Sequence, residues 1–222
     1  MNFGIIGSQG RMGQELQEWI TAQGHEISYR KDTEEEILKE KPQCLIDFSR
    51  ASALEESLAL ALKFECPLLI GTTGLEDAHW KMMKEASKST PLFYSANYSM
   101  GIQLFHQMLR AIRGQLDSWS IEMVEIHHRQ KKDKPSGTAL ALKESLGQAI
   151  DIHALRMEGV PGEHCIILTQ AGESLRIEHR ALSRMVFAQG ALQCALWLMK
   201  QKPGLYAMED MTQEAKESAH GH

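Results

Sequence analysis

The sequence predicts an α/β protein of two domains, in which a parallel-sheet domain precedes an α+β domain with a mixed sheet. Short apolar runs alternate with helical spacings up to about residue 98, and after Asn97 longer helices and neighbouring strands follow. The 222 residues are 43% hydrophobic and 24% charged, a globular composition long enough for one or two cores. We therefore expect a first domain at residues 1–98, completed by 201–222, and a second domain at 99–200.

The first domain shows a repeated strand-then-helix pattern. Strands are expected at residues 3–6, 25–29, 44–48, 67–70 and 92–94. Helices are expected through Leu16 and Ile20 up to Gly24, in part of 31–43, after a capping box of Ser52 and Glu55, and at 76–88. Strands that alternate with helices form parallel sheets covered on both faces.

The second domain begins with an amphipathic helix around residues 105–112. A strand at 121–126, a charged loop and a helix at 138–150 follow. Strands at 165–168 and 175–179 are separated by little more than a short turn, which predicts antiparallel pairing. A long helix at 183–200 precedes a Pro-Gly break and a short helical tail.

Composition excludes several classes of protein. The net charge of -5 disfavours a strongly basic nucleic-acid binder. No apolar run approaches the roughly 20 residues of a membrane helix, and the first residues lack the features of a secretory signal. The four cysteines are scattered without a C-x-x-C pair, as is typical of reduced thiols. We expect a cytoplasmic protein without nucleic-acid or membrane partners.

A glycine-rich turn joins the first strand to the first helix. Gly7-Ser8-Gln9-Gly10-Arg11-Met12-Gly13 has the spacing G-x-x-G-x-x-G, looser than the G-x-G-x-x-G of dinucleotide-binding turns. Such glycines let a pyrophosphate approach the helix N-terminus, which predicts a Rossmann-type domain, although a glycine turn without ligand would look similar. Gly71-Thr72-Thr73-Gly74 follows another strand at the same edge and would admit a nicotinamide ring, or be a simple turn.

The end of the second strand bears on cofactor choice. An acid there binds the adenosine ribose in many NAD enzymes, but this chain has Arg30 and Lys31, with Asp32 after them. A cation favours the 2′-phosphate of NADP, so we expect Arg30 to contact the cofactor and NADPH to be preferred or both nucleotides used. For Lys31 a solvated turn is the other interpretation.

A basic loop at residues 125–138 carries the clearest chemical signal. Residues 127–134 hold two histidines and four Lys or Arg against one Asp, which predicts a small anionic ligand. Pro135-Ser136-Gly137-Thr138 then opens a helix whose free N–H groups can hold a carboxylate. An imidazole nearby is suited to donate a proton. A solvated basic loop is the alternative, and adjacent histidines without nearby cysteine argue against a metal site.

These motifs closely resemble the 4-hydroxy-tetrahydrodipicolinate reductase (dihydrodipicolinate reductase) family over nearly the whole chain. The matching segments are 7–13, 47–49, 71–74, 95–101, 125–138, 159–164, 179–184, 187–191 and 202–210. The resemblance implies an NAD(P)H-dependent reductase of lysine biosynthesis through diaminopimelate, which reduces a small dicarboxylate with loss of water. It also implies a homotetramer assembled through the sheet of the second domain. The segment before residues 45–48 is shorter than in many members of the family.

The resemblance also implies roles for individual residues. His127 would donate the proton, Lys131 would bind substrate or share in proton transfer, and His128, Gly137 and Thr138 would bind substrate. The cofactor, NADPH or NADH, would be lined by Gly7, Ser8, Gln9, Gly10, Arg11, Met12, Gly71, Thr72, Thr73, Ala96, Asn97, Tyr98 and Ser99. Two other functions remain open on the residues alone: a dehydrogenase of another small substrate such as an amino acid, and a dinucleotide-sensing module without catalysis.

Overall fold

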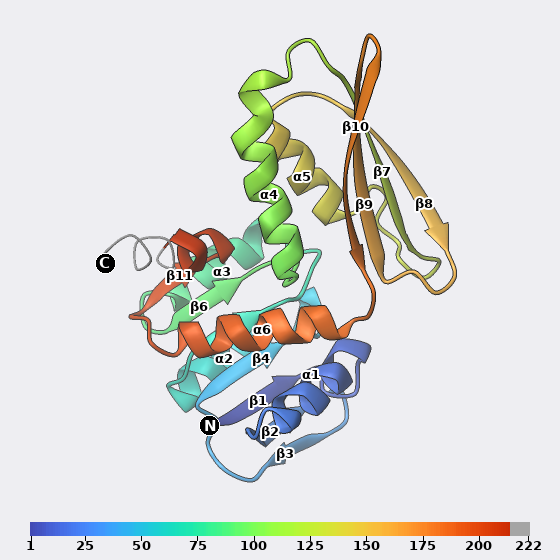
Figure 1. Cartoon of the computed structure of the whole chain (residues 1–222). Helices are drawn as coiled ribbons and strands as arrows, with labels where there is room; N and C mark the ends of the chain where they lie inside the picture. Colours follow the sequence, from blue (N-terminus) through green and yellow to red (C-terminus); the bar gives the residue numbers. More distant parts are fainter. Residues whose placement is uncertain (214–222) are drawn as a thin grey trace. The chain divides into compact units, whose positions relative to one another are not determined.

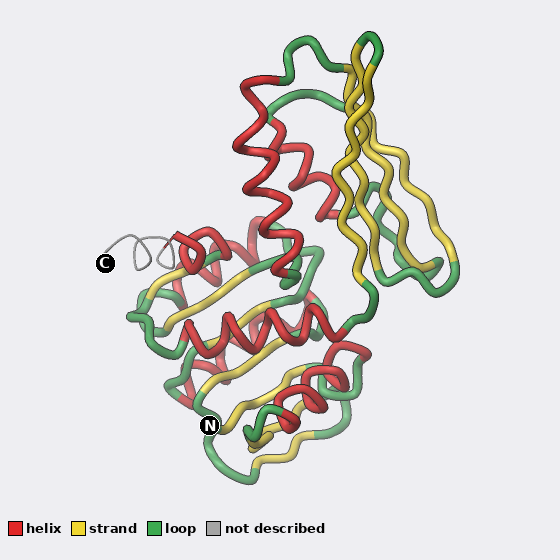
Figure 2. The backbone as a smooth tube through the Cα atoms, viewed as in Figure 1, coloured by secondary structure: helices red, strands yellow, loops and turns green. Residues whose placement is uncertain are grey.

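The computed structural model describes residues 1–213, and Figure 1 traces its helices and strands along the chain. The chain divides into two compact units. The first consists of Met1–Tyr98 together with residues 187–213, and the second of Ser99–Val186. Each unit contains its own sheet, as the strands in Figure 2 show.

The first unit has a seven-stranded sheet in the order β11-β6-β5-β4-β1-β2-β3. Its strands are β1 (Asn2–Ile6), β2 (Glu26–Lys31), β3 (Glu36–Leu38), β4 (Cys44–Asp47), β5 (Leu68–Ile70), β6 (Pro91–Tyr94) and β11 (Gly204–Tyr206). Its helices are α1 (Arg11–Ala22), α2 (Leu54–Phe64), α3 (Asp77–Ala86) and α6 (Met185–Leu198). All neighbouring strands run parallel except β2 and β3, which confirms the predicted parallel sheet.

The parallel register brings the carboxyl ends of the central strands to one edge of this sheet. Ile6 pairs with Asp47, Asp47 with Ile70, and Ile70 with Tyr94. Every residue of β4 and β5 is buried, because both faces of the sheet are covered. The turns that follow these strands therefore meet at the edge where open parallel sheets bind ligands.

Two local predictions for the first unit are wrong. Residues 31–43 contain β3 rather than a helix, because Glu36–Leu38 pairs antiparallel with Tyr29–Lys31. The capping box of Ser52 and Glu55 does not form. Residues Ala51–Ala53 make a 3₁₀ turn instead, and α2 starts after Ala53 without a side-chain cap.

Helix α6 belongs to the first unit from Phe187 on, although residues 183–200 were expected in the second domain. Its small residues permit close packing: a Cβ at Gly190 would lie 1.7 Å from the carbonyl oxygen of Tyr98. Farther along, the ring of Trp197 meets that of Phe93 edge-on, with centroids 5.9 Å apart. β11 then pairs with β6. Residues 208–213 are helical, and the rest of the predicted tail lies outside the described residues.

The second unit has a four-stranded sheet in the order β10-β9-β7-β8, with two helices. Its elements are α4 (Met100–Ile112), β7 (Ser120–His128), α5 (Gly137–Leu146), β8 (Asp151–Met157), β9 (Gly162–Gln170) and β10 (Glu173–Ala181), with a 3₁₀ turn at Arg113–Gln115. The predicted antiparallel pairing of the last two strands is confirmed. Strand β8 was not predicted, and it runs parallel to β7.

The helices α4 and α5 pack on one face of this sheet. Phe105 and Leu109 of α4, Leu142 of α5, and Met123 and Ile166 of the strands share one core. Burial along β7 alternates strictly from Ile121 to His127, because successive strand residues point to opposite faces. His127 therefore lies on the helix-covered face and His128 on the other. Among the described residues, no helix combines the length and the apolar character that a bilayer crossing requires.

Candidate active site

The glycine turn after β1 requires glycine at two positions. Gly7 has φ of +78°, in the left-handed region, and a Cβ there would lie 2.9 Å from the carbonyl oxygen of Phe48. A Cβ at Gly13 would lie 2.1 Å from the carbonyl oxygen of Gly7, so only glycine lets α1 approach the turn this closely. Gly10 is less restricted, because its added Cβ would lie 3.2 Å from the same oxygen.

The N-terminus of α1 opens onto a pocket at this edge. Gly10 provides no side-chain cap, and the first turn of α1 holds no acidic residue of its own, so the first N–H groups of the helix are not capped by a side chain of the helix. The pocket has a volume of about 240 Å³. Its lining residues are Ile6, Gly7, Gly10, Lys31, Asp32, Thr33, Phe48, Ser49, Arg50, Ala53 and Glu56.

Asp32, and not Arg30, lies at the glycine turn. Its Oδ2 accepts from the backbone N–H of Gln9 at 2.8 Å, and backbone hydrogen bonds from Gln9 and Thr33 lower the pKa of Asp32. Arg30 lines a separate pocket beside Gln17, because it points to the opposite face of β2 from Lys31. Lys31 does line the pocket, but it forms ion pairs of 3.0 and 3.5 Å with two glutamates. Of the two predicted cations, Lys31 is therefore paired with glutamates and Arg30 lies away from the glycine turn.

The other turns at this edge are organised around the buried Asp47. Its Oδ1 accepts from the hydroxyls of Ser49 at 2.6 Å and Thr72 at 3.2 Å, and burial raises its pKa. Gly71 is needed for packing, since a Cβ there would lie 2.4 Å from the ring of Phe48. The carboxyl therefore fixes the backbone around Thr72 at the predicted nicotinamide turn.

The third predicted cofactor segment, residues 96–99, divides between the two units. Tyr98 is a core residue: it is 1% exposed, and its hydroxyl donates to the carbonyl oxygen of Ile70 at 2.8 Å. Ser99 caps α4 in the second unit, accepting from the N–H of Ile102, and its Oγ lies 3.1 Å from Nε2 of His179. Both side chains are thus engaged within the protein.

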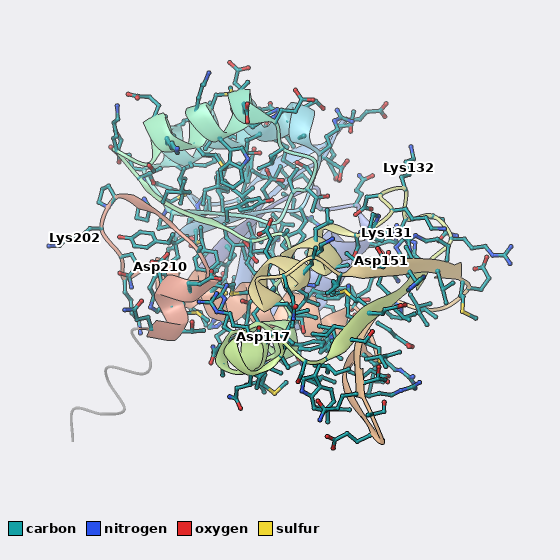
Figure 3. The ribbon with its side chains drawn as sticks, turned by 90° about the horizontal axis from the view of Figure 1, so that it is seen from above. Asp117, Lys131, Lys132, Asp151, Lys202 and Asp210 are labelled. Atoms are coloured by element: carbon teal, nitrogen blue, oxygen red, sulfur yellow. The ribbon has the colours of Figure 1, made fainter. Side chains whose placement is uncertain are left out.

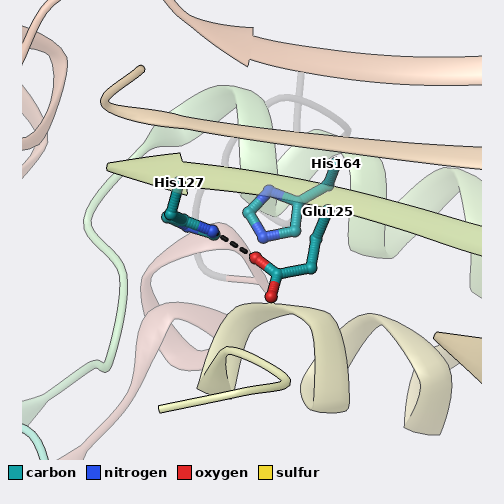
Figure 4. A group of neighbouring side chains, drawn as sticks. All are labelled: Glu125, His127 and His164. Atoms are coloured by element: carbon teal, nitrogen blue, oxygen red, sulfur yellow. Dashed lines mark hydrogen bonds and ion pairs between the residues drawn. The ribbon is translucent and has the colours of Figure 1, made fainter. Parts of the chain in front are cut away.

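The second unit buries a Glu–His pair on the helix-covered face of its sheet. Glu125 and His127 are two residues apart on β7, so both point to this face. Nδ1 of His127 donates to Oε2 of Glu125, and the ring of His164 from β9 stands edge-on to His127 with centroids 5.1 Å apart (Figure 4). A Cβ at Gly162 would lie 3.1 Å from Nε2 of His127, so the glycine leaves room at that nitrogen.

Arg156 of β8 completes this cluster. Its Nη2 donates to Oε1 of Glu125 at 2.9 Å, so both carboxylate oxygens have a partner. Burial raises the pKa of Glu125, but the hydrogen bonds from His127 and Arg156 outweigh it and lower the pKa to about 2. Burial lowers the pKa of His164 to about 3, so this imidazole is neutral. Glu125, His127 and His164 are close enough together to ligate a cation, but the guanidinium already occupies that carboxylate.

The basic loop and the start of α5 hold a carboxylate of the protein itself. Nζ of Lys131 lies 3.0 Å from Oδ1 of Asp133, and the backbone N–H of Gly137 donates to Oδ2 at 3.3 Å. Ser136 caps α5 by accepting from the N–H of Ala139. Lys132, next to Lys131, extends outward from the loop (Figure 3).

Sequence reasoning missed three residues of this site. Glu125 and His164 stand within the segments that carry the family resemblance, but neither was given a role. Ser136 Oγ lies 3.3 Å from Nε2 of His164, so the imidazole links the start of α5 to the Glu–His pair. Arg156 lies on β8, the strand that was not predicted. Conversely, the structure does not bring His128 into the cluster, since it points to the other face.

Comparison with known proteins identifies the family. Its two family models, described as the N-terminus and C-terminus of dihydrodipicolinate reductase, match residues 1–98 and 101–212. A 4-hydroxy-tetrahydrodipicolinate reductase of Thermosipho africanus is 39% identical over 215 residues, covering 97% of this chain and 99% of the relative. The Bdellovibrio bacteriovorus reductase is 39% identical over 220 residues, covering 95% and 96%.

A solved structure has the same fold. The dipicolinate-bound dihydrodipicolinate reductase from Paenisporosarcina sp. TG-14 has a TM-score of 0.74 and 19% identity, covering 93% of this chain and 97% of that one. The family models together match both units, and the curated relatives match the chain almost end to end. The chain therefore belongs to the dihydrodipicolinate reductase family of NAD(P)H-dependent oxidoreductases.

Proposed function

We propose that this chain reduces 4-hydroxy-tetrahydrodipicolinate to tetrahydrodipicolinate in lysine biosynthesis through diaminopimelate. The substrate loses its hydroxyl as water and gains one hydride and one proton. The bound nicotinamide nucleotide supplies the hydride, and the protein supplies the proton and the groups that bind two carboxylates. Membership of the family and the chemistry of the second unit support this assignment.

The observation that carries the proposal is the internal carboxylate at the basic loop. Asp133 occupies both groups predicted to bind a substrate carboxylate, the ammonium of Lys131 and the N–H of Gly137. The Asp133 side chain is 52% exposed, so it can turn away at small cost when substrate arrives. We infer that Lys131 and the first N–H groups of α5, including that of Thr138, bind one carboxylate. We also propose His128 as a substrate contact. Its side chain points to the opposite face of the sheet from that of His127.

His127 is the proposed proton donor. Its Nδ1 is engaged by Glu125, which leaves Nε2 as the nitrogen that can transfer a proton. The space beside Gly162 lies at that nitrogen. The acid that protonates the ring carbon next to the site of hydride addition would therefore be Nε2 of His127, held in one orientation by a buried carboxylate.

Asp32 and Arg50 are the proposed determinants of nucleotide choice. Both line the pocket at the glycine turn, where Asp32 would accept from the ribose hydroxyls and Arg50 would attract a 2′-phosphate. This replaces the expectation that Arg30 performs the second role. We propose that the protein accepts both NADH and NADPH.

The open face of the second sheet is the proposed assembly surface. Leu155 on β8 is 46% exposed, and its register partner Ile126 points to the same face, as do the neighbouring pair of Val124 and Cys165. Charged residues of β10 border this apolar strip. A sheet face of this kind supports self-association, with a homotetramer as the proposed state. A cytoplasmic location is proposed from the four free cysteines.

A coupled assay tests the proposed activity. The substrate is generated in situ by the condensing synthase that precedes it, and loss of reduced-nicotinamide absorbance is followed after this chain is added. Turnover that depends on both components supports the proposal. Oxidation of aspartate or another amino acid without this turnover would instead assign another dehydrogenase. Nucleotide binding without any turnover would assign a sensing module.

A further inference from the structure

Glu125 is a fully buried carboxylate whose two oxygens bind groups from different strands. Oε2 accepts from His127 on β7, and Oε1 accepts from Arg156 on β8 at 2.9 Å. The parallel register pairs His127 with Arg156 and Glu125 with Ala154. The small side chain of Ala154 stands beside Glu125 on the same face, so the carboxylate and the guanidinium meet over it.

The guanidinium of Arg156 also binds the backbone of the basic loop. Its Nε donates to the carbonyl oxygen of Lys131 at 3.3 Å, and its Nη2 donates to that of Asp133 at 2.5 Å. Arg156 is 14% exposed in its side chain, against 0% for Glu125. One planar, persistent cation therefore ties the buried carboxylate to the loop that carries Lys131.

We propose that Arg156, acting through Glu125, is a positioning residue for proton transfer by His127. This inference rests on the proposed function. Arg156 keeps Glu125 as a carboxylate, and that carboxylate keeps the proton of His127 on Nδ1 and its ring in place, so that Nε2 faces the reacting carbon. The same guanidinium fixes the loop, so the proton donor and the carboxylate-binding lysine keep a constant separation.

The charges around the cluster agree with this assignment. The groups that face the Glu–His pair are Arg156 from β8, Lys131 from the loop and His164 from β9, with His179 on β10 beyond it. His164 and His179 both have pKa values lowered by burial. The nearby imidazoles thus add no competing positive charge at neutral pH. Glu125 is the carboxylate that contacts both His127 and Arg156, whereas Asp133 pairs with Lys131.

Steady-state kinetics across pH test the proposal with Glu125→Gln, Arg156→Gln and Arg156→Lys. An acid must be protonated to act, so kcat falls at alkaline pH, and loss of the adjacent negative charge moves that fall to lower pH. We expect Glu125→Gln and Arg156→Gln to lower kcat about ten-fold or more, as removal of an orienting partner does elsewhere. We expect Arg156→Lys to restore part of kcat and of the pH profile.

The chain provides a matched control in Glu122→Gln. Glu122 forms an exposed pair with His153, 2.6 Å between Oε2 and Nε2, between the same two strands. This variant should keep the wild-type kcat and pH profile. Nucleotide titration and thermal unfolding of each variant check that the fold survives, and if Glu125→Gln does not fold, the two Arg156 variants decide.

Two outcomes would overturn the inference. One is wild-type kcat in Glu125→Gln and Arg156→Gln while His127→Ala is inactive. The other is a lower kcat with an unchanged pH profile and no difference between Arg156→Lys and Arg156→Gln, because a purely structural role predicts that result. If instead the proposed function is wrong, the wild-type protein shows no turnover of this substrate, or the His127→Ala variant retains turnover.

Discussion

Replacing Gly10 with valine should separate nucleotide binding from folding. Gly10 has φ of -67° and ψ of 162°, a backbone conformation that any residue adopts. An added Cβ would meet only the carbonyl oxygen of Gly7, at 3.2 Å. The two methyl groups of valine would then occupy space over the N-terminus of α1, where a pyrophosphate must approach the backbone closely.

The structure sets the expected magnitudes. With no cap hydrogen bond to lose, Gly10→Val should change the free energy of unfolding by about 1 kcal/mol or less. Its dissociation constant for NADH and NADPH should rise at least ~10-fold, which corresponds to about 1.4 kcal/mol. Gly13→Ala gives the contrast, because its Cβ would lie 2.1 Å from a backbone oxygen. Overpacking of that kind should destabilise the fold by roughly 3 kcal/mol.

Titration calorimetry with each nucleotide and urea unfolding measure the two effects. Unchanged nucleotide affinity in a folded Gly10→Val protein would refute the assignment of this turn as the pyrophosphate site. Equal destabilisation by Gly10→Val and Gly13→Ala would show that the turn is constrained for folding alone.

Three further predictions concern nucleotide choice, catalysis and pH. Asp32→Asn should raise the ratio of kcat/KM for NADPH over that for NADH, whereas Arg30→Ala, in a separate pocket, should leave the ratio unchanged. His127→Ala should lower kcat by about a hundred-fold, while Lys131→Ala should raise KM for the substrate as well, and neither should alter nucleotide affinity in a titration. His164 resists protonation when folded, with a pKa of about 3. Its protonation in the unfolded chain should therefore lower the free energy of unfolding by about 1.4 kcal/mol per pH unit below pH ~6 in urea titrations, and His164→Gln should remove this contribution while that of His179 remains.

The sequence predicted the features of the fold that depend on local pattern. The runs at 44–46 and 68–70 are apolar throughout because both faces of the parallel sheet are covered, so their apolar character and short length identified them as strands. The spacing of Gly7 and Gly13 similarly marked the strand-to-helix turn. By contrast, Glu36–Leu38 is a strand because it pairs with β2, and its own residues do not favour that state.

The residues that complete the site depend on pairing between distant segments. Asp32 reaches the glycine turn through the register of β1 with β2, so an acid one position after the strand lies where an acid at the strand's end was expected. Arg156 reaches Glu125 only because β8 lies parallel to β7 in one register. A shift of one residue would turn Arg156 to the open face. No local pattern contains that information.

Lys131 and Arg156 of the second unit differ in how deeply their ion pairs are buried. This difference suits them to two different roles in the proposed reaction. The Lys131–Asp133 pair is 25% and 52% exposed, so water screens it and a substrate carboxylate can replace Asp133 at small cost. The Arg156–Glu125 pair is 14% and 0% exposed, and separating it would leave a charge buried without a partner. Lys131 is therefore suited to bind substrate, and Arg156 is suited to hold His127, the proposed proton donor, in place.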